Sequence, residues 1–147
     1  FAKKRSKEIN WIDANVEEYS SDIGSFDVII CHHVIEHLKE PVKFIKKIYR
    51  LMKEDAIFII STPDFDCGIA RLFDKNFRML NDPTHISLFS LESLNRLLKD
   101  TGFILIDTDS PYFETTYFNE ENLIKTLNKN NLSPPFYGNW ITSFVKK

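Results

Sequence analysis

Glycine is scarce in this chain, and no two glycines lie near one another in the sequence. The four glycines are Gly24, Gly68, Gly102 and Gly138. A loop that presses backbone amides against a phosphate or a cofactor needs glycines at short spacing, because a Cβ atom would block the close approach. None of the four can therefore belong to a glycine-rich ligand-binding loop.

Cysteine is also rare, with only Cys31 and Cys67. Two distant cysteines exclude a disulfide framework and favour a reducing compartment, so we expect a cytoplasmic protein. No apolar run approaches the roughly 20 residues that a membrane span requires, and no signal peptide is visible. The first residue is Phe1 rather than Met, which predicts that the natural protein has further residues upstream.

The charge balance is close to neutral. Among 147 residues the formal net charge is -2, with 43% hydrophobic and 27% charged residues. This composition is typical of one ordinary globular domain, and no whole-chain field favours nucleic acid or anionic lipid. Nucleic acid is therefore not a favoured partner.

Short apolar runs alternate with amphipathic segments along the chain. Runs rich in β-branched residues predict strands at 26–31, 56–60, 103–108 and 140–145, and a short one at 9–12. Helices are predicted after Pro41, between Ser90 and Gly102, at 119–127, and at the charged residues 2–8. Such alternation predicts an α/β fold with a largely parallel sheet.

Three segments in order carry a family resemblance. Residues 26–38 read F-D-V-I-I-C-H-H-V-I-E-H-L, residues 56–63 read A-I-F-I-I-S-T-P after the helix from Pro41, and residues 85–90 read H-I-S-L-F-S before a helix ending in T-G-F. Together they resemble class I S-adenosylmethionine-dependent methyltransferases. The resemblance implies a Rossmann-like class I sandwich, mainly parallel with an antiparallel last strand. It also implies one methyltransferase domain over 1–147, with substrate-cover segments at 64–89 and 111–131.

The resemblance starts after the first strand of that family. The family's E/D-x-G-x-G-x-G loop, which holds the methionine part of the cofactor, has no counterpart here, and neither has the acid of strand two. In the family, strands one and two lie between strands three and four. Without them the fourth family strand would lack its usual neighbour. We therefore expect an N-terminally truncated domain, in which this chain corresponds to the C-terminal two-thirds. We expect this piece alone to be inactive and to bind S-adenosylmethionine, or the product S-adenosylhomocysteine, weakly.

The resemblance also indicates where the cofactor lies. Two groups of residues follow the third and fourth family strands and are expected to bind it: Asp13, Asn15 and Val16 at the adenine, and Cys31, His32 and His33 at the methionine part. A plain turn at 13–16 and a small buried hydrophobe at Cys31 remain open as alternatives.

The segment His33-Val34-Ile35-Glu36-His37 has the form H-x-x-E-H. Read alone it matches a zinc-hydrolase signature, the less favoured reading because the motif begins at a strand exit and lacks a distal third ligand. Small-RNA 2′-O-methyltransferases and ubiquinone-pathway O-methyltransferases resemble it more closely, with an E-x-x-E-H group that binds a divalent cation. Here His33 replaces the first Glu, and His85 matches the later His of the RNA enzymes. A metal held by His33, Glu36, His37 and His85 is therefore open but not favoured.

The favoured reading is methyl transfer to a small molecule, at oxygen, with a histidine as base. His37 and His85 are the candidate catalytic residues, because imidazole accepts a hydroxyl proton near neutral pH. A sugar, a lipid-linked intermediate or a quinone precursor is a compatible acceptor, and a homodimer is compatible too. The alternative is a non-catalytic methyltransferase-like domain used for binding or assembly.

Overall fold

A four-stranded sheet forms the centre of the molecule. The computed structural model describes residues 9–19, 22–110, 115–135 and 139–147, and the helix predicted at 2–8 lies outside this part. The strands β1 (Phe26–His32), β2 (Met52–Pro63), β3 (Ile104–Asp109) and β4 (Trp140–Lys146) take the order β1-β2-β4-β3. β1 and β2 are parallel, and β4 runs antiparallel to both of its neighbours. The predicted Rossmann-like sheet, with an antiparallel last strand, is confirmed.

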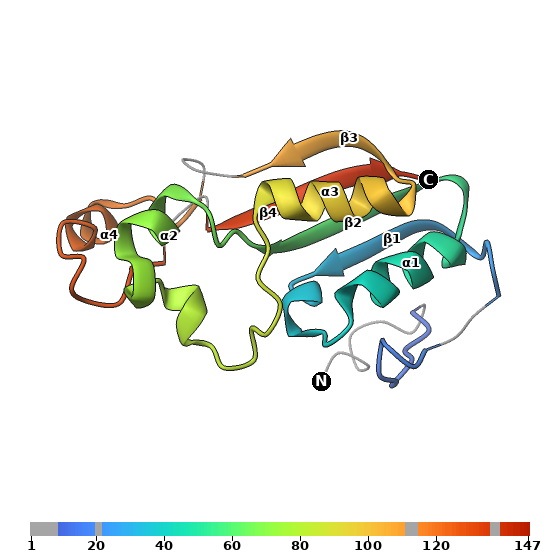
Figure 1. Ribbon diagram of the computed structural model, residues 1–147, viewed down its shortest axis with the longest axis horizontal. Helices are drawn as coiled ribbons and strands as arrows, with labels where there is room; N and C mark the ends of the chain where they lie inside the picture. Colours follow the sequence, from blue (N-terminus) through green and yellow to red (C-terminus); the bar gives the residue numbers. More distant parts are fainter. Residues whose placement is uncertain (1–8, 20–21, 111–114, 136–138) are drawn as a thin grey trace.

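Two amphipathic helices, α1 (Pro41–Leu51) and α3 (Leu91–Thr101), cover one face of this sheet (Figure 1). Pro41 opens α1, where its missing N–H removes no hydrogen bond. Ser90 and Ser93 form a reciprocal N-cap of α3, and Gly102 ends it in the left-handed region at φ 111°. The start and stop signals predicted from the sequence are therefore the ones that bound these helices.

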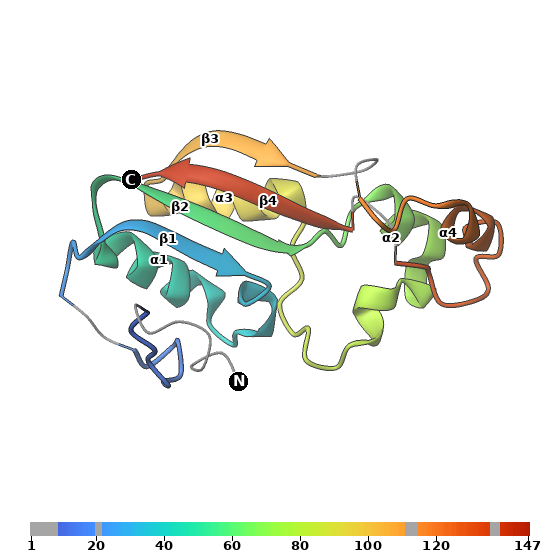
Figure 2. The same ribbon diagram turned by 180° about the vertical axis from the view of Figure 1, so that it is seen from behind.

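The core lies between those helices and the sheet. Phe58 and Ile60 of β2 are fully buried against this side, whereas Ile57 and Ile59 alternate onto the other face. On that other face Val28 is 53% exposed and Ile30 is 64% exposed. Figure 2 shows this face with no helix of the described residues over it. The apolar run of β1 predicted burial on both faces, but only one face is covered here.

A smaller lobe adjoins the carboxyl ends of β1 and β2 (Figure 1). It contains α2 (Gly68–Phe73), two 3-10 turns at Asp74–Asn76 and Arg78–Asn81, and α4 (Glu120–Lys125). Its own apolar cluster consists of Ile69, Ala70, Phe73 and Phe77, packed by Phe65, Cys67, Met79, Phe118 and Trp140. These elements lie in the two segments expected to cover a substrate, 64–89 and 111–131. Residues 111–114 of the second segment lie outside the described residues.

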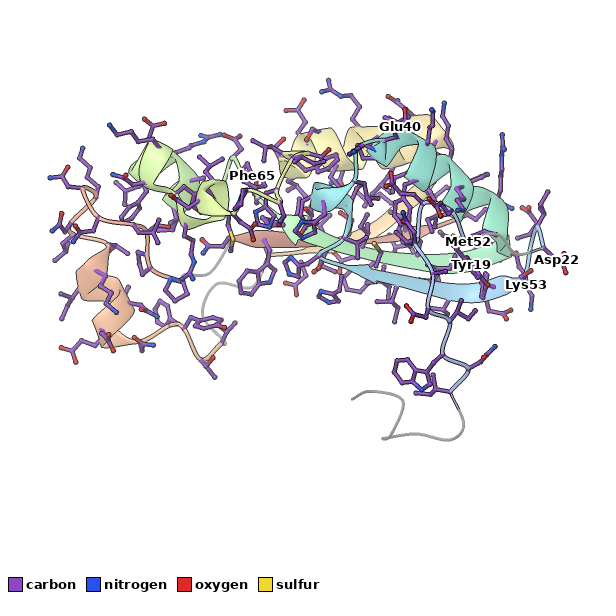
Figure 3. The ribbon with its side chains drawn as sticks, turned by 90° about the horizontal axis from the view of Figure 1, so that it is seen from below. Tyr19, Asp22, Glu40, Met52, Lys53 and Phe65 are labelled. Carbon is purple, nitrogen blue, oxygen red and sulfur yellow. The ribbon has the colours of Figure 1, made fainter. Side chains whose placement is uncertain are left out.

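The strand predicted at 9–12 is wrong, since this stretch has no regular structure. A strand needs a neighbour for its backbone groups, and no described strand pairs with this stretch. The following residues form a turn in which the Asn15 carbonyl accepts from the amides of Glu18 and Tyr19. Tyr19 lies near Met52 and Lys53, at the end of the sheet remote from Phe65 (Figure 3). None of the helices in the described ranges is long and apolar enough to span a membrane.

Candidate active site

The site is built on the turn that follows β1. His33 adopts the left-handed conformation with φ 49°, which is uncommon for a residue with a Cβ atom. The chain then enters a short 3-10 helix, Ile35–His37, whose first residue is completely buried in the core. Anchored by Ile35, this turn places the side chain of Glu36 inside the protein and that of His37 at its surface.

Glu36 is the centre of the site and is completely buried. Its Oε1 lies 3.2 Å from His33 Nδ1, and its Oε2 accepts a hydrogen bond from Thr62 Oγ1 at 3.1 Å. Burial alone would raise the pKa of this carboxyl, but the hydrogen bonds from His33, from its own backbone amide and from Thr62 outweigh burial and hold the pKa below its ordinary value. Glu36 is therefore a buried carboxylate.

The backbone of Glu36 also brings a distant segment to the site. Its carbonyl oxygen accepts hydrogen bonds from the amides of Ile86 and Ser87, both at 2.9 Å. The Ser87 hydroxyl donates to the Leu38 carbonyl at 2.8 Å. These bonds fasten residues 85–87 beside the 3-10 helix, so His85 reaches the same edge as Glu36.

His37 and His85 lie next to each other, with ring centroids 5.0 Å apart. His37 Nδ1 is 3.0 Å from the Thr84 carbonyl oxygen, and His85 Nδ1 is 2.7 Å from the Met79 carbonyl oxygen. A carbonyl oxygen only accepts, so each Nδ1 carries the hydrogen and the Nε2 of each neutral ring keeps its lone pair. Phe65 packs edge-on against His85 at 6.1 Å between centroids.

Three of the four residues considered as metal ligands form one group. One ligand atom each from Glu36, His37 and His85 lies within 4.8 Å of the others, and His37 Nε2 is 3.9 Å from Glu36 Oε1. The Nδ1 bonds to backbone carbonyls are the outer contacts typical of metal-binding histidines. A carboxylate with two imidazoles fits a divalent cation. His33 is outside this group and serves as a hydrogen-bond partner of Glu36.

The residues predicted to bind the cofactor at its methionine part border the same edge. The Cys31 side chain is buried in the core, where desolvation and the nearby Glu36 charge raise its thiol pKa to about 12, so only its backbone faces the edge of the sheet. His32 is exposed, and its Nδ1 is 2.7 Å from Ser61 Oγ. The His33 amide donates to the Ser61 carbonyl.

The structure does not bring the predicted adenine residues to the histidines. Val16 lines an open hollow of about 300 Å³ along β1, which Ile48 and Leu51 of α1 also line. Asp13 and Asn15 are exposed, and Asn15 Oδ1 accepts from the Glu17 amide within its own turn. Residues 9–12, which precede them, do not form a strand, so no strand pairing holds this part of the chain against the carboxyl edge of the sheet.

Sequence reasoning did not single out three residues at this edge. Thr62 bonds to Glu36, and its position in the T-P segment at the end of β2 was the available signal. Trp140 packs edge-on against His33 at 6.1 Å. Asn139 is completely buried, and neither polar atom of its side chain has a hydrogen-bond partner among the described residues. Nothing in the sequence pattern marks Trp140, the first residue of β4, or Asn139, which directly precedes it and whose carbonyl accepts a hydrogen bond from the Asp64 amide.

The comparisons with known proteins agree with this fold. A family model described as a methyltransferase domain matches residues 2–108. The chain therefore belongs to the class I S-adenosylmethionine-dependent methyltransferase family.

Curated relatives resemble parts of the chain. A ubiquinone biosynthesis O-methyltransferase of Rickettsia prowazekii is 39% identical over 62 residues, covering 42% of this chain and 24% of the relative. An S-adenosylmethionine-dependent methyltransferase of Mycobacterium tuberculosis is 26% identical over 102 residues, covering 69% of this chain and 35% of the relative. The chain thus spans only about a quarter to a third of the length of these relatives.

Solved structures show the same fold at low identity. A Thermotoga maritima methyltransferase superposes with a TM-score of 0.67 and 18% identity over 92% of this chain and 63% of its own. A Burkholderia thailandensis N1-methyltransferase with bound S-adenosylhomocysteine has a TM-score of 0.62 and 14% identity over 99% of this chain and 54% of its own.

Proposed function

We propose that this chain is the catalytic part of an S-adenosylmethionine-dependent methyltransferase that methylates a hydroxyl group of a small molecule. The observation that supports this most is the convergence of Glu36, His37 and His85 at the carboxyl edge of the sheet. Ligands of open α/β sheets bind outside this edge. The partial likeness to ubiquinone biosynthesis O-methyltransferases favours oxygen as the acceptor atom.

The residues would contribute orientation and a base. In the proposed step the acceptor oxygen forms a bond to the methyl carbon, the bond from that carbon to sulfur breaks, and the hydroxyl proton passes to an imidazole Nε2. His37 and His85 both offer that lone pair, because each Nδ1 bonds to a carbonyl. The buried negative charge of Glu36 stabilises the imidazolium that results.

The lobe formed by α2 and α4 is proposed as the substrate cover. Phe65 connects its apolar cluster to His85, and Trp140 connects it to His33. Phe65 and Trp140 are partly exposed, and aromatic side chains of this kind would suit an aromatic or lipid-like acceptor such as a quinone precursor. It would also exclude water from the transferred methyl group.

A divalent cation at Glu36, His37 and His85 is the second candidate. The three ligand atoms within 4.8 Å of one another support it. A bound cation would lower the pKa of an acceptor hydroxyl and orient it. In that case the two histidines would act as ligands and neither would serve as the base.

The test uses the complete protein that contains these residues. Binding of S-adenosylhomocysteine by calorimetry and methyl transfer to a panel of phenols, catechols and sugars would be measured for wild type and for His37→Ala. We expect the variant to bind the cofactor normally and to lose at least tenfold in kcat. Lys39→Ala, an exposed neighbour, is the matched control. Absence of cofactor binding in the wild type would favour the non-catalytic alternative.

The two candidates separate on metal content. Elemental analysis of purified wild type should find one divalent cation per chain if the cation is bound, and less than a third of that in Glu36→Gln or His85→Ala. If the histidines act as a simple base, the protein should carry no stoichiometric metal and methyl transfer should survive a chelator.

A further inference from the structure

The positive charge of the chain is concentrated on helix α1 and its flanks. Residues 39–53 contain six cations and one acid, a net charge of +5, whereas the whole chain has a net charge of -2, so the rest of the chain carries -7. α1 itself contains no acid. The helix beside it, α3, is equally long but balances two acids with two cations: Glu92, Asp100, Arg96 and Lys99. An excess of cations is therefore a property of α1 and not of both exposed helices.

The excess charge lies on the outer side of α1. The buried residues of this helix are Phe44, Ile45, Ile48 and Leu51. On a helix with 3.6 residues per turn, the side opposite to them carries four exposed residues: Val42, Lys43, Lys46 and Arg50. Lys43 pairs with Glu40 at the start of the helix. Lys47 lies at the flank and donates to the carbonyls of Val16 and Glu17, so residues 16–17 do not cover the outer side.

Exposed aliphatic side chains lie at the end of this side that is nearest to the candidate active site. Val42 is 48% exposed, Ile86 53% and Leu88 51%. The hydrogen bonds to the Glu36 and Leu38 carbonyls fasten Ile86 and its neighbour beside the short 3-10 helix that precedes α1. α1 starts at the carboxyl end of β1 (Figure 1). An apolar end beside the site thus continues into a row of cations that leads away along the helix.

We propose that this outer side docks on an anionic lipid bilayer. The docking face is defined by its cations and its aliphatic side chains: Lys39, Lys43, Lys46, Arg50, Val42, Ile86 and Leu88. Each Lys or Arg close to a membrane surface is attracted by anionic headgroups, and aliphatic side chains enter the boundary between headgroups and acyl chains. A nucleic acid or an acidic protein segment would match the cations alone, whereas a bilayer matches both groups.

The position of the docking face gives it a role in catalysis. The inference rests on the proposed methyl transfer to a lipid-like acceptor, because it explains how such an acceptor reaches the site. Ile86 directly follows His85, and Lys39 comes two residues after His37. Docking therefore holds the two histidines beside the bilayer, and an acceptor with an apolar tail enters the site from the lipid without crossing water.

Vesicle sedimentation with the complete protein tests the docking. Wild type should bind phosphatidylcholine vesicles that contain phosphatidylglycerol at least tenfold more tightly than vesicles of phosphatidylcholine alone, and added salt should weaken this binding. The double variant Lys46→Glu/Arg50→Glu should lose at least tenfold in affinity for the mixed vesicles. Arg96→Glu/Lys99→Glu makes the same change of charge on α3 and is the matched control, which should bind as wild type does.

Three results would overturn the docking: equal binding of wild type to both kinds of vesicle, equal losses in the two double variants, or tighter binding of a mixed-sequence RNA than of the mixed vesicles. Calorimetric binding of S-adenosylhomocysteine and methyl transfer to a water-soluble phenol are measured on the same proteins. Both should be unchanged in Lys46→Glu/Arg50→Glu, which also shows that the variant is folded. Failure of both in wild type would contradict the proposed function, and the vesicle result separates that failure from a failure of the docking.

Discussion

The imidazole rings of His37 and His85 lie 5.0 Å apart and are inclined by 46°. Each Nδ1 hydrogen bonds to a main-chain carbonyl, of Thr84 for His37 and of Met79 for His85. The two rings come from separate segments that are joined through the backbone carbonyl of Glu36. The two rings therefore lie close enough together to share the proposed role, either as a base or as ligands of one cation.

If His37 and His85 share one role, the losses of activity on replacing them should not be additive. His37→Ala and His85→Ala should each lower kcat by a factor of at least ten, and the double variant should lose little more than the worse single variant. The physical reason is that each ring depends on the other to hold the acceptor hydroxyl or the cation. Single-turnover methyl transfer by the four proteins measures this. Losses that multiply in the double variant would show two independent roles.

The buried carboxylate of Glu36 predicts a pH-dependent stability. Hydrogen bonds hold its folded pKa below the ordinary 4.5, so its contribution is fully present above that value and is lost as pH falls through the folded pKa. Glu36→Gln should cost about 1–3 kcal/mol in the free energy of unfolding at pH 7. The difference between the two proteins should shrink below pH 4. Denaturant melts at pH 7, 5 and 3.5 test this, and a constant difference would contradict it.

Replacing Asn139 by an apolar residue should raise the stability of the protein and impair its function. Its buried amide has no hydrogen-bond partner in the part of the chain that the structure describes, so Asn139→Leu should raise the free energy of unfolding by about 1 kcal/mol. We expect KM for the methyl acceptor to rise, because unpaired buried polar groups are retained where they serve a ligand. Asn122→Leu is the matched control, since that amide donates to the Tyr117 and Pro135 carbonyls and its loss should destabilise. An Asn139→Leu protein that is more stable and equally active would remove the functional role.

Replacing Gly102 should destabilise the protein through backbone strain at the end of α3. Its φ is +111°, and a Cβ atom there would lie 3.2 Å from Tyr49 Oη. Gly102→Ala should cost about 1–2 kcal/mol, because a side chain is strained in the left-handed region. Gly68→Ala, which meets nothing within 4 Å, should change stability by less than about 0.5 kcal/mol. Thermal melts of both variants make the comparison.

Much of the local structure follows from the sequence alone. Pro41, Ser90 and Gly102 set the helix boundaries because capping and backbone freedom act within one turn. The apolar runs of β1 and β2 define their strands, and the F-D-V-I, T-P and H-x-x-x-F-S segments carry the family resemblance. The stretch 9–12 failed as a strand because pairing is not local, and the described residues offer it no neighbour.

The site itself was decided by tertiary structure. The sequence placed Glu36 and His37 in one motif and suggested His85 as a third member. In the structure, bonds from the Ile86 and Ser87 amides to the Glu36 carbonyl, and from the Ser87 hydroxyl to the Leu38 carbonyl, bring His85 there. Thr62 reaches Glu36 from β2, and Trp140 reaches His33 from β4. Capping residues and apolar runs act over a few residues and determine where helices and strands begin and end. The contacts between distant segments depend on how those helices and strands pack around the buried carboxylate of Glu36.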